Sequence, residues 1–206
     1  MSGMRTIGNA AVALAAFVFS AGSAIPAPSV TSIWMQTGSV TSQPIGHYEF
    51  CQQYVNECSI KSGSTTPPRV TERGWQVIRE INSSVNAAIA PITDEDLYGK
   101  DEVWAYPSDA GDCEDYALLK RRTLMEQGFS AADLLMTVLL KPDGEGHAVV
   151  TVRTSQGDFI LDNLEEDVLL WSKTSYKFLK RQASFNSGRW VTITNGEDLA
   201  VGSVEN

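Results

Sequence analysis

The sequence predicts one α+β domain in which N-terminal helices pack on an antiparallel sheet. Three observations lead to this fold class. The first half has apolar residues at helical spacing, the second half has short β-branched runs between turn residues, and 206 residues with 43% apolar side chains can bury one core of ordinary size. Because the strands follow the helices instead of alternating with them, we expect α+β and not a parallel α/β fold.

The N-terminus has the layout of a secretory signal peptide over residues 1–24. An apolar stretch follows Arg5 and leads to a run of small residues that ends at Ala24. That stretch has about ten residues, whereas a membrane-spanning helix needs roughly 20, so we expect a periplasmic or secreted protein without stable membrane insertion. By composition the remaining chain is an extended lead-in, a folded domain and a C-terminal tail, at residues 25–46, 47–195 and 196–206.

Two helices are predicted. The first, between Thr71 and Ala90, has a capping residue at its start, Pro91 as a stop, and one apolar face made by Val77, Ile78, Ile81, Val85 and Ile89. The second runs from about Cys113 to Gln127 with Gly128 as its C-terminal cap, and its core candidates are Ala117, Leu118, Leu124 and Met125.

Four strands are predicted after the second helix, because short apolar or β-branched runs there are broken by Gly, Asn, Asp and Pro. They lie at Leu134 to Leu140, His147 to Arg153, Asp158 to Asp162, and Arg189 to Thr194. The chain has no internal repeat, and nothing in its composition indicates a second domain.

The net charge of −9 excludes one class of partner. No block of Lys and Arg is present that could neutralise a polyphosphate backbone, so we do not expect nucleic-acid binding. The acidity is typical of a soluble enzyme or of a protein that binds cations.

Three cysteines are informative in an exported protein, because an oxidising compartment pairs those that can meet. Cys51 and Cys58 are seven residues apart, and closing that loop would stabilise the fold by about 2.5 kcal/mol on a chain-entropy estimate. We therefore expect a Cys51–Cys58 disulfide and a free Cys113. A free cysteine is either an inert buried thiol or a reactive one.

The surroundings of Cys113 favour a reactive thiol. The turn-rich segment before it runs directly into the second helix, so the sulfur lies at a helix N-terminus, where the macrodipole favours the thiolate. Of the two histidines, His47 precedes the disulfide loop and His147 begins a strand after a turn. We expect His147 to be the general base.

The length of a predicted hairpin loop decides whether His147 and Asp162 lie on the same face of the two strands. If the loop between their two strands has two or four residues, Asp162 lies opposite Val149, on the strand face to which His147 also points. Asp162 could then orient the imidazole and stabilise the imidazolium. Taken singly, such a histidine is more often a surface or core residue, and an aspartate before Asn is more often a turn residue.

The sequence also resembles the bacterial transglutaminase-like cysteine peptidases, which include the LapG-type periplasmic proteases. The resemblance covers residues 47–194 and is carried by Gly111-Asp112-Cys113-Glu114-Asp115-Tyr116-Ala117, by Gly146-His147-Ala148-Val149, by Leu161-Asp162-Asn163, by Phe50-Cys51 with Cys58, and by Trp104. It implies a papain-like, transglutaminase-type core with Cys113, His147 and Asp162 in the catalytic positions. It also implies a protein substrate such as a large surface adhesin.

The carboxylates of Asp112, Glu114 and Asp115 oppose thiolate formation at Cys113. They could simply cap the helix and fill its first turn. Alternatively they bind a hard cation through oxygen ligands, and the resemblance implies that this cation is Ca²⁺. No EF-hand spacing is present, and two distant histidines with one free cysteine do not match a zinc site.

These residues predict an exported cysteine peptidase, in which Cys113 attacks an amide carbonyl and water hydrolyses the acyl-enzyme. The Cys113 backbone N–H is the expected oxyanion donor, and Trp104 and Tyr106 are nearby candidates for a second donor. Two alternatives stay open: a transglutaminase-type acyl transferase, and a non-catalytic envelope module that binds calcium or a protein.

Overall fold

The structure, a computed structural model, describes residues 1, 3, 32–64 and 66–196. The predicted signal peptide, except Met1 and Gly3, and the predicted tail after Gly196 lie outside the described residues. The chain divides into two units, Met1–Val30 and Thr31–Asn206, and every helix and strand below belongs to the second.

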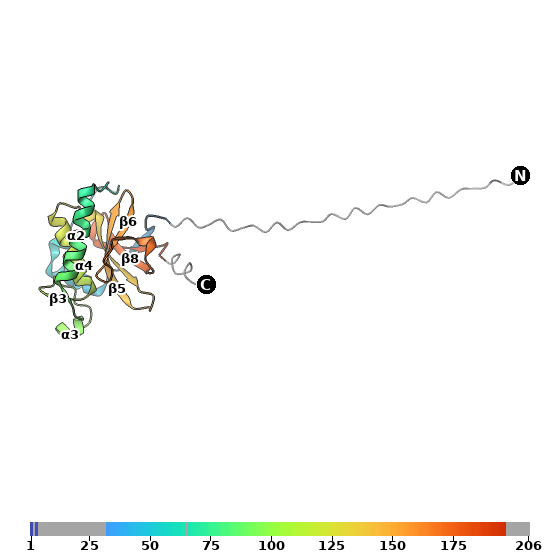
Figure 1. The fold of residues 1–206 in the computed structure, drawn as a ribbon. Helices are drawn as coiled ribbons and strands as arrows, with labels where there is room; N and C mark the ends of the chain where they lie inside the picture. Colours follow the sequence, from blue (N-terminus) through green and yellow to red (C-terminus); the bar gives the residue numbers. More distant parts are fainter. Residues whose placement is uncertain (2, 4–31, 65, 197–206) are drawn as a thin grey trace. The chain divides into compact units, whose positions relative to one another are not determined.

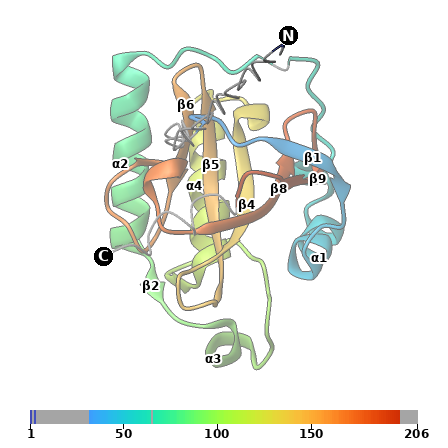
Figure 2. The same cartoon turned by 90° about the vertical axis from the view of Figure 1, so that its right-hand side faces the viewer.

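A seven-stranded sheet organises the second unit, and its strands pair in the order β1-β9-β8-β4-β5-β6-β7 (Figures 1 and 2). All of these pairs are antiparallel. The strands are β1 (Thr37–Thr41), β4 (Leu134–Leu140), β5 (Gly146–Thr154), β6 (Gly157–Leu161), β7 (Leu169–Leu170), β8 (Lys177–Ala183) and β9 (Asn186–Ile193). The predicted α+β class with an antiparallel sheet is confirmed.

Four α-helices accompany the sheet in the part of the chain that the structure describes. They are α1 (Ile45–Gln53), α2 (Glu72–Ala88), α3 (Asp94–Tyr98) and α4 (Cys113–Glu126). The long helices α2 and α4 cover the same face of the sheet (Figure 1). Among the described residues, no helix is both long and apolar enough to cross a membrane.

The two long helices begin and end as the sequence predicts. The Thr71 hydroxyl accepts a hydrogen bond from the Gly74 N–H and caps α2. At the end of α4 the N–H groups of Gly128 and Phe129 donate to the carbonyls of Met125 and Leu124, and Gly128 has a φ of 90°. This pair of bonds is a Schellman cap, which favours glycine because a side chain is strained at that φ.

Helices α2 and α4 run antiparallel to each other. A Cβ added to Gly74, in the first turn of α2, would lie 3.8 Å from the ring of Phe129, which follows α4. At the other end, the Tyr116 hydroxyl in α4 donates to the carbonyl of Ile89, the residue that ends α2. Each further turn along α4 therefore faces an earlier turn of α2.

Two apolar cores lie on opposite faces of the sheet. The larger core, between helices and sheet, includes Ile78, Leu118, Leu124, Met136, Val150 and Leu161, and the smaller one includes Met35, Leu139, Val149, Ile160, Trp171 and Phe178. Adjacent residues such as Val149 and Val150 divide between the two cores, because strand side chains alternate between the faces. Both faces of the central strands are therefore buried.

The structure corrects the description of residues 25–46 as a lead-in outside the fold. Its described part contains β1, which pairs with β9 at the sheet edge. The strand has almost entirely exposed side chains, so no apolar alternation marks it in the sequence. Strand β8 also escaped prediction, because its buried positions include Arg181 and Gln182, whose side chains are hydrogen-bonded inside the fold.

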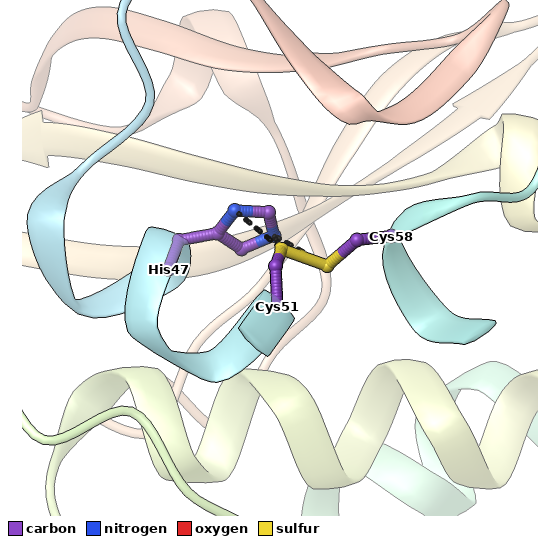
Figure 3. A group of neighbouring side chains, drawn as sticks. All are labelled: His47, Cys51 and Cys58. Carbon is purple, nitrogen blue, oxygen red and sulfur yellow. Dashed lines mark hydrogen bonds between the residues drawn. A yellow bond between two sulfur atoms is a disulfide. The ribbon is translucent and has the colours of Figure 1, made fainter. Parts of the chain in front are cut away.

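Cys51 and Cys58 form the expected disulfide, with Cα atoms 5.6 Å apart (Figure 3). His47 lies one helical turn before Cys51, and its Nδ1 is 3.5 Å from the Cys51 sulfur. The Gln182 side-chain amide donates to His47 Nε2 at 3.0 Å, and burial lowers the pKa of His47 to about 3. His47 is therefore a neutral histidine of the packed interior.

Candidate active site

Cys113 is the first residue of α4, and the preceding residue Asp112 has an extended backbone. The cysteine is free and only partly exposed. The backbone N–H of Ala148, in β5, donates a hydrogen bond to its sulfur. Because β5 begins with Gly146 and His147, this bond puts the thiol beside the strand that carries the histidine.

His147 and Asp162 are brought together by the β5–β6 hairpin. Thr154 pairs with Gly157, so the loop has two residues, and this register continues to the pair Val150 and Leu161. Asp162 follows directly, and its Oδ1 lies 2.8 Å from His147 Nε2. Both side chains are almost fully buried. With Nε2 facing a carboxylate, Nδ1 is the imidazole nitrogen left to take a proton from a thiol.

Three further groups hold Asp162. The Leu164 N–H donates to its Oδ1 at 2.9 Å, the Tyr176 hydroxyl donates to its Oδ2 at 2.6 Å, and the Asn86 side-chain amide donates to its backbone carbonyl at 2.9 Å. Burial acts to raise the pKa of Asp162, but the hydrogen bonds from His147, Leu164 and Tyr176 outweigh it and lower the pKa. Asp162 is therefore an ionised carboxylate at neutral pH.

Sequence reasoning missed Tyr176. It lies between β7 and β8, outside every predicted strand, and no motif marks it. Its ring also contacts the imidazole of His147, with centroids 5.8 Å apart. Only the packing of this segment against the end of β6 shows that Tyr176 belongs with Asp162.

The immediate surroundings of Cys113 do not favour a thiolate. Its sulfur donates to Glu114 Oε2 at 3.2 Å. Burial, followed by the negative charge of Glu114, raises the pKa of the thiol well above its usual range, and the Ala148 N–H offsets this only in part. Neutralising the neighbouring negative charge would therefore favour an active thiol.

That charge belongs to a cluster of four acids. Asp94, Asp112 and Asp115 each place a carboxylate oxygen within 4.8 Å of the others, and Glu114 approaches both Asp112 and Cys113 in the same way. The three acids predicted from the sequence, Asp112, Glu114 and Asp115, are thus adjacent in space. The fourth, Asp94, was not predicted, because Thr93-Asp94 in the sequence has the pattern of an ordinary helix start.

A short parallel pairing brings Asp94 to the cluster. Strand β2 (Ala90–Pro91) pairs with β3 (Ala110–Gly111), and the Ile92 N–H donates to the Gly111 carbonyl. The start of α3 therefore lies beside the start of α4. Gly111 is required here, since a Cβ at this position would come within 2.5 Å of the Asp115 carboxylate.

Each aspartate of the cluster has one oxygen held by the backbone and one without a partner. The N–H groups of Val103, Ala105 and Asp94 donate to Asp94, Asp115 and Asp112 respectively. The other oxygens, Asp94 Oδ1, Asp112 Oδ1 and Asp115 Oδ2, are buried and have no hydrogen-bond partner among the described residues. Three converging, unpartnered carboxylate oxygens fit a hard divalent cation.

The raised pKa values of two acids in the cluster also indicate a cation site. Burial, with hydrogen bonding and charge from Asp112, raises the pKa of Glu114 to about 9. Burial, with charge from Asp112 and Asp94, raises the pKa of Asp115 to about 7. Without a cation the fold therefore holds these acids partly protonated at neutral pH, which is costly for residues that could ionise freely in an unfolded chain.

Neither candidate for a second oxyanion donor is suitably placed. The indole N–H of Trp104 donates to Glu102 at 3.2 Å, and its ring packs against His47. Tyr106 lies under the guanidinium of Arg122, 4.6 Å from its ring centroid, beside the C-terminal half of α4. Of the oxyanion donors considered, the backbone N–H of Cys113 remains.

Comparisons with known proteins identify a family and a fold. The model of a family described as the bacterial transglutaminase-like cysteine proteinases matches residues 37–198, so the match begins at β1. An EGTA-treated structure of Legionella pneumophila LapG shares 28% sequence identity with this chain and covers 59% of this chain and 68% of its own, with a TM-score of 0.50. Another LapG structure from the same organism shares 26% identity and covers 62% of this chain and 73% of its own, also with a TM-score of 0.50. A calcium-bound LapG structure, 23% identical over 64% of this chain and 80% of its own, has the same TM-score and shows a common fold. A search of curated proteins finds no match.

Proposed function

Because the chain belongs to the bacterial transglutaminase-like cysteine proteinase family, and is therefore a cysteine peptidase, we propose that it is exported and cleaves a cell-envelope or surface protein with Cys113, His147 and Asp162. The observation that carries the proposal is the buried pair His147 and Asp162, with Nε2 and Oδ1 2.8 Å apart. Ala148, the residue after His147 in β5, donates to the Cys113 sulfur. The three side chains come from the start of α4, from β5 and from the end of β6, and α4 packs against the sheet that contains these two strands.

In the proposed mechanism, His147 Nδ1 accepts the Cys113 proton while the sulfur attacks the carbonyl carbon of the scissile amide. The Cys113 N–H donates to the oxygen that becomes negatively charged. When the C–N bond breaks, the imidazolium returns its proton to the leaving amine. Water, deprotonated by the same imidazole, then hydrolyses the thioester and releases the acid product.

Asp162 keeps His147 ready for both proton transfers. Its carboxylate accepts from Nε2–H, which fixes the tautomer with a free Nδ1, and its negative charge stabilises the imidazolium between the two steps. Tyr176 and Leu164 hold the two carboxylate oxygens, so the carboxylate cannot rotate away from the imidazole.

The acid cluster supports a Ca²⁺ site made by Asp94, Asp112 and Asp115, with Glu114 beside it. Its three unpartnered buried oxygens are the ligand type that calcium prefers, and a relative was solved with calcium bound. A bound cation would neutralise the acids whose charge raises the pKa of Cys113. We therefore propose that calcium permits thiolate formation.

The proposed location and the proposed substrate of the peptidase rest on two different observations. The signal peptide expected over residues 1–24 leads to the proposal of export to the periplasm or beyond. The substrate class is a large surface adhesin, as the resemblance to LapG-type proteases implies.

The proposal is tested by comparing new protein N-termini on cells that express the wild-type chain or Cys113→Ser. We expect a small set of surface-protein N-termini that requires the cysteine and disappears when calcium is chelated. An identical set of N-termini in both strains would contradict proteolysis. A labelled primary amine is added in parallel, because its attachment to the acid product would instead indicate an acyl transferase.

Labelling of the thiol tests the residue roles directly. With calcium present, Cys113 should react with iodoacetamide well below pH 8.5, and His147→Ala should abolish that reactivity at low pH. His47→Gln is the comparison variant, since His47 is buried away from the thiol. An ordinary thiol titration in the wild-type protein would show that the three residues do not form a working triad.

A further inference from the structure

Lys120 is a buried cation that the proposed mechanism does not use. It lies in α4 seven residues after Cys113, which is two helical turns and therefore the same helix face. Lys120 is 1% exposed, and its Nζ has no hydrogen-bond partner among the residues that the structure describes. A buried ammonium without a partner costs several kcal/mol, so its presence requires an explanation.

The packing of the helices places Lys120 beside α2. The Tyr116 hydroxyl reaches the end of α2 at Ile89, and the two helices run antiparallel. Lys120 is one turn further along α4, with its Nζ 6.0 Å from the centroid of the Tyr116 ring. It therefore lies beside the part of α2 that comes before Ile89.

Asn82 and Asn86, one turn apart in α2, hold the chain that follows β6. Asn86 donates to the Asp162 carbonyl, and Asn82 donates to the carbonyls of Glu165 and Glu166 at 3.2 and 3.0 Å. The side-chain carbonyl oxygens of Asn82, Asn86 and Asn163 are buried without a partner in the described part of the chain. Three acceptor oxygens without partners thus lie on or beside the segment that follows β6, and Asp162 in that segment is the charged group that acts on the ammonium of Lys120.

Two titratable groups act on Lys120 from the elements packed around it. Asp162, at the end of β6, is the charge that stabilises its ammonium, and Tyr116 lies beside it on its own helix, whereas the α2 side chains that hold the chain after β6 are the amides of Asn82 and Asn86. Burial lowers the pKa of Lys120 to about 7, although the charge of Asp162 opposes this. Lys120 therefore changes charge in the range where an imidazole titrates.

We propose that Lys120 is a positioning residue for the catalytic pair, and that its ammonium, lying behind the Asp162 turn, stabilises the Asp162 carboxylate and makes the imidazolium of His147 more acidic. The proposal rests on the proposed function of His147 and Asp162. A less basic imidazole returns its proton to the leaving amine more readily, so the cation assists the step that releases the first product.

The test is an NMR titration of the imidazoles, in mature protein that carries Cys113→Ser and bound calcium. The chain has two histidines, and His47 is held neutral by burial, so the signal that titrates between pH 4 and 9 belongs to His147. In the Lys120→Met variant we expect the His147 midpoint to rise by on the order of half a pKa unit. Lys120→Arg should leave the midpoint at its wild-type value, because arginine retains the charge.

The shape of the titration curve gives a second readout. With Lys120 present, the curve should be broader than a one-proton transition, because two interacting cations lose charge over the same range. It should narrow to one proton in Lys120→Met and in Lys120→Arg. Lys61→Met is the matched control, since Lys61 is exposed and its removal changes the net charge equally.

An unchanged His147 midpoint in Lys120→Met would overturn the proposal. Equal shifts of the midpoint in Lys120→Met and Lys120→Arg would also overturn it, because they would indicate that repacking and not charge moves the midpoint. A midpoint that moves as expected in a protein whose wild-type form lacks peptidase activity would instead refute the proposed function alone. Thermal unfolding of each variant identifies any that fail to fold. If Lys120→Met does not fold, Lys120→Gln provides the same comparison with a neutral polar side chain.

Discussion

At the scale of single residues, Asp162 is the most constrained group of the candidate site. It accepts hydrogen bonds from His147, Leu164 and Tyr176, and its backbone carbonyl accepts one from Asn86. The sequence predicts the first of these contacts through the parity of the hairpin. The other three depend on which loops and helices pack around the end of β6.

The Tyr176→Phe substitution tests how much Asp162 depends on its support. It removes the O–H donor 2.6 Å from Asp162 Oδ2 while keeping the ring that contacts His147. Since a hydrogen bond to a charged group is worth about 1.5 to 3 kcal/mol, we expect kcat/KM to fall about tenfold or more with little change in KM. Tyr48→Phe, at an exposed position, should have no effect. Unaltered kcat/KM in Tyr176→Phe would mean that the hydroxyl does not position Asp162.

Burial of Lys120 should affect the pH dependence of the free energy of unfolding as well as catalysis. Its pKa is lowered to about 7 in the folded protein, against about 10.4 for a free lysine, so between these values the unfolded chain binds more protons. The contribution of Lys120 to stability should therefore rise with pH across this window. Lys120→Met should be more stable below pH 7, by about 1 to 4 kcal/mol, and should lose that advantage towards pH 10.

Urea unfolding at pH 6 and pH 9.5 measures this difference, and Lys61→Met serves as the surface control. A Lys120→Met protein that is less stable at pH 6 would show that the ammonium makes favourable contacts. Greater stability combined with lower activity would show that the fold retains Lys120 for function at a cost in stability.

At the scale of elements, two short pairings assemble the site. The β5–β6 hairpin sets His147 against Asp162, and the β2–β3 pair sets the start of α3 against the start of α4. The first joins neighbours in sequence, so a turn rule predicts it. The second joins two-residue segments about 20 residues apart, too short to leave a recognisable strand pattern.

The element-scale prediction concerns Asp94, which only the β2–β3 pairing brings to the cluster. Asp94→Asn should weaken calcium binding about tenfold or more, because one negative ligand is lost. The readout is calorimetric titration of Ca²⁺ into mature, chelator-treated protein. Glu95→Gln is the matched control, because Glu95 lies in the same helix turn and is exposed. Equal affinities in both variants would exclude Asp94 as a ligand, and absence of heat in the wild type would exclude the site.

At the scale of the whole molecule, one sheet with two long helices on one face supports the site, while α1 and the disulfide lie apart from it. Cys51 and Cys58 join α1 to the following 3₁₀ turn, Val55–Cys58. From that turn Glu57 forms an ion pair with the buried Arg121 of α4 at 3.2 Å. The disulfide therefore stabilises the side of the domain that supports α4.

Replacing Cys51 and Cys58 together by serine should lower the free energy of unfolding by about 2.5 kcal/mol while leaving the folded enzyme active. Reducing agent should destabilise the wild-type protein to a similar extent and should not affect the double variant. Urea unfolding, with peptidase activity measured below the transition, checks both. Loss of activity in a folded double variant would instead link the disulfide to the site.

The sequence by itself determined the parts of this protein that depend on local pattern. These are the two long helices with their caps, four of the strands, the pairing of Cys51 with Cys58, and the placement of His147 and Asp162 on the same face of a hairpin. Such features depend on periodicity and turn chemistry within about 20 residues. Tertiary structure alone decided that Asp94 joins the acid cluster, that Tyr176 holds Asp162, and that Lys120 is buried. These contacts join separate elements, and their residues are polar, so no hydrophobic pattern marks them before the chain packs.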